Sequence, residues 1–185
     1  MLGAIGGGVA FYLQRSDDGS LAKSVVTTDE WADQYCEAFE PYNSEGSTLY
    51  NSIAAGLATS DLGTQASADQ LKDSILKFGE IAQKFLVDLE VLAETKTIAG
   101  GAGETFGNDV LEGVSAAQAK VTATVEAIGE LDTSNADFGE TALSTVLKNG
   151  LTFNSKVKVA PSAVLDEVNA AIGGRGGCLS VLDSD

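Results

Sequence analysis

The sequence predicts an all-α fold: an up-and-down helical bundle of about four helices, stapled by one disulfide. Hydrophobic residues make up 44% of the 185 residues but aromatic residues only 6%, and much of the apolar content is alanine, the strongest helix former. The only prolines are Pro41 and Pro161, which permits long helices. Apolar residues recur at helical spacing, and no alternating stretch of useful length predicts a sheet.

The first helix is predicted to begin near Thr27 or Thr28. Thr27 and Glu30 have the spacing of a capping box, in which each side chain binds the other residue's backbone N–H. A stripe of aromatic residues at every fourth position follows, and this spacing is more typical of a helix core than of a ligand pocket. The stripe consists of Trp31, Tyr35 and Phe39.

Pro41 should kink or break this helix near Glu40, because proline lacks the N–H that a helix interior needs. Helical spacing of apolar residues resumes after the proline. The apolar positions there are Leu49, Ile53 and Leu57.

The second helix is predicted over residues 68–97, with Ser67 and Gln70 as its cap. At 1.5 Å per residue it would be roughly 45 Å long. Its apolar residues alternate steps of four and three, the seam expected for antiparallel helix packing. The seam consists of Leu71, Ile75, Phe78, Ala82, Phe85, Leu89 and Leu92.

The rest of the chain is predicted to hold a third helix, a shorter helix over residues 137–148 and a last helix after Pro161, which suits a first helical turn. Breaks are expected at the glycine-rich residues 100–103 and at the turn-forming residues 132–135. Residues 156–159 alternate like a strand, but a single short run cannot make a sheet. The third helix should bury Phe106, Val110, Val114, Ala117, Val121, Val125, Ile128 and Leu131.

Cys36 and Cys178 are the only cysteines, so only one intramolecular pairing is available. A bridge between them would close a loop of more than 100 residues, and the glycines between residues 173 and 177 would let the tail bend back onto the first helix. The alternative is two buried, reduced and unrelated thiols. We expect the disulfide, and with it an oxidising compartment.

Residues 1–15 are predicted to be an apolar, membrane-associated segment, residues 16–27 a polar linker, and residues 28–185 an acidic helical-bundle domain. The apolar stretch is too short to cross a bilayer, which needs about 20 residues. It could be the end of an anchor that begins upstream, a short segment among other membrane helices, or an ordinary terminus. The residues expected to contact the membrane are Leu2, Ile5, Val9, Phe11, Tyr12 and Leu13.

The net charge of -16 disfavours binding to nucleic acid and to anionic lipid headgroups. The charge could attract a basic carrier protein, although the simplest explanation is solvation of the outer helix faces. Because positive charge marks the cytoplasmic side of a membrane, an acidic body favours the outer side.

The chain has no histidine, which removes the commonest general base and a common metal ligand. No catalytic residue, cofactor site or metal site is predicted. The carboxylates at Glu80, Asp88, Glu90 and Glu94 fall mostly off the seam of the second helix and are interpreted as its solvated face. An enzyme would have to work with carboxylates alone.

Residues 31–36 read Trp-Ala-Asp-Gln-Tyr-Cys, with a second cysteine at Cys178. This W-A-D-x-x-C pattern with a late cysteine resembles a group of small extracytoplasmic helical proteins and lipoproteins of actinobacteria. The chain departs from the lipoprotein form, because no lipid-acceptor cysteine follows its apolar N-terminus. In size and layout it is also similar to accessory subunits of the actinobacterial respiratory supercomplex of cytochrome bcc and oxidase.

The expected function is therefore a non-catalytic accessory or assembly subunit that docks on a larger membrane protein complex. We expect it on the outer face of the cytoplasmic membrane, with the respiratory supercomplex as the best candidate partner. The alternative is an envelope protein that binds a lipid or another apolar ligand between its helices, which would require a cavity.

Overall fold

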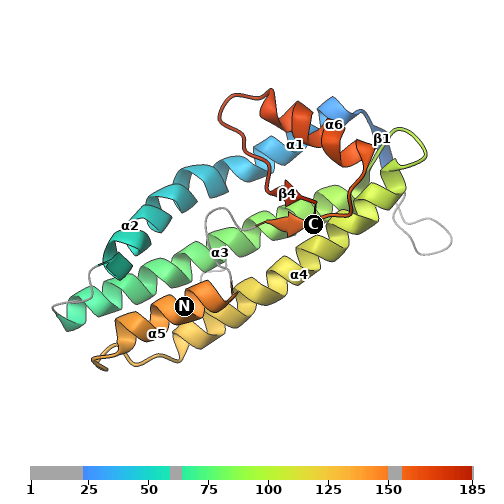
Figure 1. Cartoon of the computed structure of the whole chain (residues 1–185). Coiled ribbons are helices and arrows are strands. Elements are labelled where there is room, and N and C mark those ends of the chain that lie inside the picture. The colour runs from blue at the N-terminus through green and yellow to red at the C-terminus, as the bar shows by residue number, and fades with distance from the viewer. Residues whose placement is uncertain (1–22, 59–63, 150–155, 185) are drawn as a thin grey trace, which may run out of the picture.

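The computed structural model describes residues 23–58, 64–149 and 156–184. This part of the chain is mostly helical, as predicted, and forms five helical rods instead of about four (Figure 1). The fifth rod arises because the last helix lies across the first one at one end of the molecule. In the described residues, no helix is both long and apolar enough to cross a membrane.

The first rod begins where the sequence predicts. Helix α1 (Thr28–Pro41) has Thr27 as its N-cap, and both halves of the capping box with Glu30 are formed. The backbone N–H of Thr27 donates to Glu30 Oε2 over 2.8 Å, and the N–H of Glu30 donates to Thr27 Oγ1 over 3.2 Å.

Pro41 was predicted to kink or break this helix, and of these two outcomes the break does not occur, although the regular α-helical pattern ends at Pro41. A single π-helical segment, η1 (Tyr42–Gly46), follows Pro41 and leads directly into α2 (Ser47–Ala58). Proline removes one N–H and crowds the preceding turn, and a wider turn accommodates it without ending the helix. The rod continues because Phe39, Tyr42 and Ile53 remain buried along one side of it.

Helix α3 (Gln65–Thr95) begins three residues earlier than predicted. Its cap is Thr64, whose side chain accepts from the N–H of Ser67, so Ser67 is inside the helix and is not the cap. The whole predicted seam of this helix is buried, from Leu71 to Leu92. The helix ends at Thr95 because Lys96 turns to extended backbone.

Helix α4 (Gly103–Gly129) runs back along α3, and α5 (Phe138–Asn149) packs beside α4 at the far end (Figure 1). The turn between α4 and α5 is held by Lys72 of α3, whose Nζ donates to the backbone oxygens of Gly129 and Leu131 over 2.8 and 2.7 Å. A cation at the C-terminal end of a helix is also favoured by the helix dipole.

Two short parallel strand pairs contradict the prediction that no sheet forms. Strand β1 (Ser24–Val26) pairs with β2 (Lys96–Ile98), so residues of the predicted linker form a strand of the domain. Strand β3 (Val157–Lys158) pairs with β4 (Leu182–Asp183). The run at residues 156–159 finds its partner in the C-terminal tail, which the sequence pattern did not indicate.

Helix α6 (Ala163–Gly173) packs on α1. Its N-cap is Ser162, whose Oγ accepts from the N–H of Leu165 over 3.1 Å. Pro161 therefore precedes the cap, and the prediction that it occupies the first helical turn is wrong. A hydroxyl can cap the first free N–H groups of a helix, which proline cannot do.

The core is built around aromatic rings at the junction of α1, α3 and α4. Trp31 meets Phe106 edge to face with ring centroids 5.4 Å apart, and Phe39 meets Phe85 in the same way at 5.6 Å. Trp31, Tyr35 and Phe39 are at most 2% exposed. The predicted stripe is thus part of the core.

Candidate functional site

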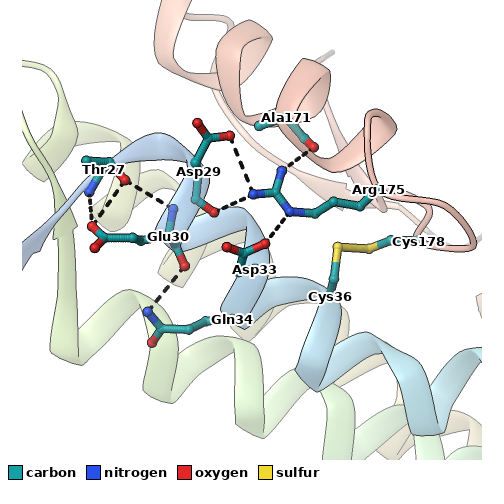
Figure 2. A network of polar contacts seen from close by, with 9 residues as sticks. All are labelled: Thr27, Asp29, Glu30, Asp33, Gln34, Cys36, Ala171, Arg175 and Cys178. Atoms are coloured by element: carbon teal, nitrogen blue, oxygen red, sulfur yellow. Dashed lines mark hydrogen bonds and ion pairs between the residues drawn. A yellow bond between two sulfur atoms is a disulfide. The ribbon is translucent and has the colours of Figure 1, made fainter.

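The most distinctive arrangement in the molecule holds the C-terminal tail against α1, and we call it the C-terminal clasp. It consists of the disulfide between Cys36 and Cys178, the side chain of Arg175 with its partners, and the hydroxyl of Tyr35. Figure 2 shows the disulfide and the arginine side by side between α1 and the segment after α6.

The predicted disulfide between Cys36 and Cys178 is formed, across 142 positions of sequence. The two Cα atoms are 5.6 Å apart, within the normal range for a bridge. The chain reverses just before Cys178, where Gly177 has a φ of +84°, a conformation that a side chain would strain. The glycines of the tail thus have the role that the sequence suggested.

Arg175 ties the same tail to the first turns of α1. Its Nε donates to Asp33 over 2.6 Å, and its Nη2 donates to the backbone oxygen of Asp29 over 2.7 Å (Figure 2). It also donates to the backbone oxygen of Ala171 at the end of α6. One guanidinium therefore joins two helices, a geometry that lysine could not reproduce.

Hydrogen bonds lower the pKa values of two exposed carboxyl groups at the start of α1. The hydrogen bond from Arg175 lowers the pKa of Asp33. The hydrogen bonds from the backbone and the side chain of Thr27 lower the pKa of Glu30. Because the Asp33 carboxylate faces water, its contact with Arg175 orients the tail more than it stabilises it.

Tyr35 holds the end of the tail from inside the core. Its hydroxyl donates to the backbone oxygen of Leu179 over 3.0 Å and accepts from the N–H of Val181 over 2.9 Å. The ring is 0% exposed, and burial raises the pKa of the phenol, so the hydroxyl keeps the proton that it donates. These two bonds place the tail next to β3.

Replacing Tyr35 with phenylalanine is expected to lower the free energy of unfolding by about 2 kcal/mol, because the buried N–H of Val181 loses its acceptor. Denaturant unfolding measures the loss. Hydrogen exchange of the Val181 amide should accelerate, while the Ala99 amide, bound to Val26 between the other strands, serves as an unchanged internal reference. Equal exchange at Val181 in both proteins would contradict the role given to Tyr35.

Sequence reasoning identified the disulfide but missed Arg175 and the hydroxyl of Tyr35. The chain has only two arginines, Arg15 and Arg175, and the second lies alone in a glycine run. This isolation is the one signal that could have pointed to it. The sequence predicted Tyr35 in the core, which is correct for the ring. It did not predict the two hydrogen bonds that the hydroxyl makes with the tail.

The rest of the described surface offers no arrangement with evident chemistry. In the described ranges, no three side chains among histidine, cysteine, aspartate and glutamate are grouped closely enough to hold a metal ion. On α3, Glu80 and Glu94 are exposed as predicted, but Asp88 and Glu90 are half-buried. Glu90 Oε2 accepts from Gln118 Nε2 of α4 over 2.8 Å, so it does not belong to the solvated face.

A hollow of about 420 Å³ lies beside the N-terminal half of α3. Most of its lining side chains are polar or charged and face solvent, which does not suit an apolar ligand. The lining residues are Leu49, Ala66, Asp69, Gln70, Asp73, Ser74 and Lys77.

The residues expected to contact the membrane lie outside the described part of the chain. They remain a prediction from the sequence: Leu2, Ile5, Val9, Phe11, Tyr12 and Leu13.

Comparison with known proteins gives no relative from which a role can be transferred. No protein-family model, no curated protein and no solved structure matches this chain. What the clasp does must therefore be inferred from its own residues.

Proposed function

We propose that this protein is a non-catalytic accessory or assembly subunit that docks on a larger membrane protein complex, on the outer face of the cytoplasmic membrane. The observation that carries the proposal is the disulfide between Cys36 and Cys178, the only two cysteines of the chain. Disulfides persist in oxidising compartments and are rare in the cytosol, so the acidic body belongs outside the cytoplasm.

Three further features support a docking role. The apolar segment at residues 1–15 would keep the body next to a membrane. The chain has no histidine, and the aromatic stripe of α1 is buried in the core. The clasp fixes the C-terminal tail to α1, which gives a rigid body suited to binding a partner surface. By its resemblance in layout, the respiratory supercomplex is the first partner to test.

The test is co-purification from native membranes. The protein is tagged after Asp185, the membranes are solubilised in mild detergent, and the proteins that elute are identified by mass spectrometry. We expect a membrane protein complex in stoichiometric amount. Recovery of the protein alone would refute the docking role, and a lipid in the same spectrum would favour the lipid-binding alternative.

The compartment has an independent test. Thiol titration of the denatured but unreduced protein, taken from its native cell, should find no free cysteine. Two free thiols would place the chain in a reducing compartment and remove the observation on which the proposal depends.

A further inference from the structure

We infer that two copies of this protein associate through the outer side of α3, as an antiparallel and two-fold symmetric pair. This inference goes beyond the function proposed above and does not depend on it. The contact surface is a line of exposed residues on α3, which we call the outer stripe. It consists of Asp73, Lys77, Glu80, Lys84, Val87, Val91 and Glu94.

The outer stripe lies on the side of α3 that faces away from the bundle. Its members alternate steps of four and three, so they follow one line along the helix. The buried seam of α3 alternates in the same way on the opposite side, where the helix packs against α1, α2 and α4. All seven members of the outer stripe are exposed, so no helix of the described chain covers this second seam.

Two valines form the apolar part of the outer stripe. Val87 is 42% exposed and Val91 is 51% exposed, and residues four apart on a helix are neighbours. The other large hydrophobic residues that are exposed in the described ranges lie singly on different elements, at Val25, Leu147 and Leu179. Burial of two adjacent valines is favourable, but it does not by itself specify what covers them.

The charges beside the valines identify the occupant as a second copy of this chain. Lys84 precedes Val87 by three positions, and Glu94 follows Val91 by three. In an antiparallel pair with Val87 opposite Val91 of the other copy, the valines cover one another. The same register brings Lys84 opposite Glu94 of the other copy, and two-fold symmetry repeats both contacts. One register thus satisfies the apolar and the charged residues together.

A parallel pair would have the opposite effect on the charges. It would place Lys84 beside Lys84 and Glu94 beside Glu94, and like charges in contact disfavour a pairing. In the described chain Glu94 forms no ion pair, and Lys84 forms an exposed one with Asp88 over 3.3 Å. Because exposed ion pairs of this kind contribute little stability, Lys84 can exchange this contact for one with a second copy.

The contact should be small and reversible. Helix α3 ends at Thr95, so in this register the two helices overlap over residues 83–95, a length of roughly 20 Å. A contact of this length is at the small end of protein interfaces. The net charge of -16 on each copy opposes association, so the measurement requires physiological salt to screen the repulsion.

Charge reversal tests the pairing in the full chain. Sedimentation velocity over a range of protein concentrations, in mild detergent and physiological salt, measures the dimerisation constant. K84E and E94K should each lower this constant about tenfold or more, because each places like charges opposite one another at two symmetric positions. The double variant K84E/E94K restores opposite charges and should return the constant to within about threefold of the parent.

The valines provide a matched pair of variants. V91D should lower the dimerisation constant about tenfold or more, because it buries a charge, while L147D on α5 should leave the constant within about twofold. A parent that stays monomeric at every concentration would overturn the inference. A dimer that the single charge reversals leave unchanged, or a double variant as weak as the single ones, would do the same.

Cysteine crosslinking tests the orientation separately. The native cysteines are bridged to each other, so V87C and V91C each carry one free thiol. On oxidation, a mixture of the two variants should form a linked dimer faster than either variant alone, because the antiparallel register brings these positions together. Faster linking within each variant alone would show a parallel pair and overturn the inference. Neither result affects the co-purification test of the proposed function.

Discussion

Replacing both Cys36 and Cys178 with serine is expected to lower the free energy of unfolding by about 5 kcal/mol. The estimate follows from the entropy that a bridge across 142 positions removes from the unfolded chain. Since a domain of this size is usually stable by about 5–15 kcal/mol, the variant should be close to the limit of folding. Urea unfolding of the parent and the variant measures the difference.

Two controls sharpen this experiment. Each single serine variant should lose about as much stability as the double variant, because either one opens the same loop. Reduction of the parent should reproduce the loss without any substitution. A loss below about 1 kcal/mol would mean that the bridge does not restrain the unfolded chain, and that the clasp is held by Arg175 and Tyr35 instead.

Replacing Gly113 with alanine is expected to lower the free energy of unfolding by about 3 kcal/mol, although alanine is the better helix former. Gly113 lies in the middle of α4, where β3 crosses the helix. A Cβ atom there would lie 2.1 Å from the backbone oxygen of Lys158 and 2.9 Å from Val157 Cγ1. The strand cannot yield freely, because Val157 and Val159 are hydrogen-bonded to the tail.

Gly129 provides the matched control in the same helix. A Cβ atom at Gly129 would meet nothing within 4 Å, so alanine there should be neutral or stabilising by up to about 1 kcal/mol. Thermal or urea unfolding of the two variants gives the comparison. Equal stability of the two variants would show that the contact between α4 and β3 is looser than the structure indicates.

Both predictions concern how the tail is held, and this bears on the proposed function. The tail is fixed by the bridge at Cys178, by Tyr35 and by the pairing of β3 with β4. A body whose C-terminal tail is fixed in this way keeps α1, α6 and the strand pair β3–β4 in one arrangement. Loss of the bridge should therefore lower the amount of partner complex that co-purifies with the protein, even under conditions in which the helices remain folded.

The helices could be predicted from the sequence, because the signals for where they begin and end are local. The capping box at Thr27, the seam of α3 and the glycine break before α4 each depend on residues within a few positions of one another. The sequence also left only one possible disulfide, because two cysteines allow one pairing, and the structure shows that this bridge is formed. Where local signals compete, the sequence was less reliable: Thr64 and Ser67 are both suitable caps, and the earlier one is used.

The contacts between distant segments could not be predicted from local signals. The strands contain two or three residues each, too few for a periodic pattern, and β1 is paired with a segment about 70 positions away. Pro41 stays in a continuous rod because burial of Phe39 and Tyr42 against α3 outweighs the local cost of proline. Gly113 and Arg175 have their roles because β3 and α1 come to lie beside them. Such contacts depend on how the helices pack, and packing is set by the whole chain and not by any single stretch of it.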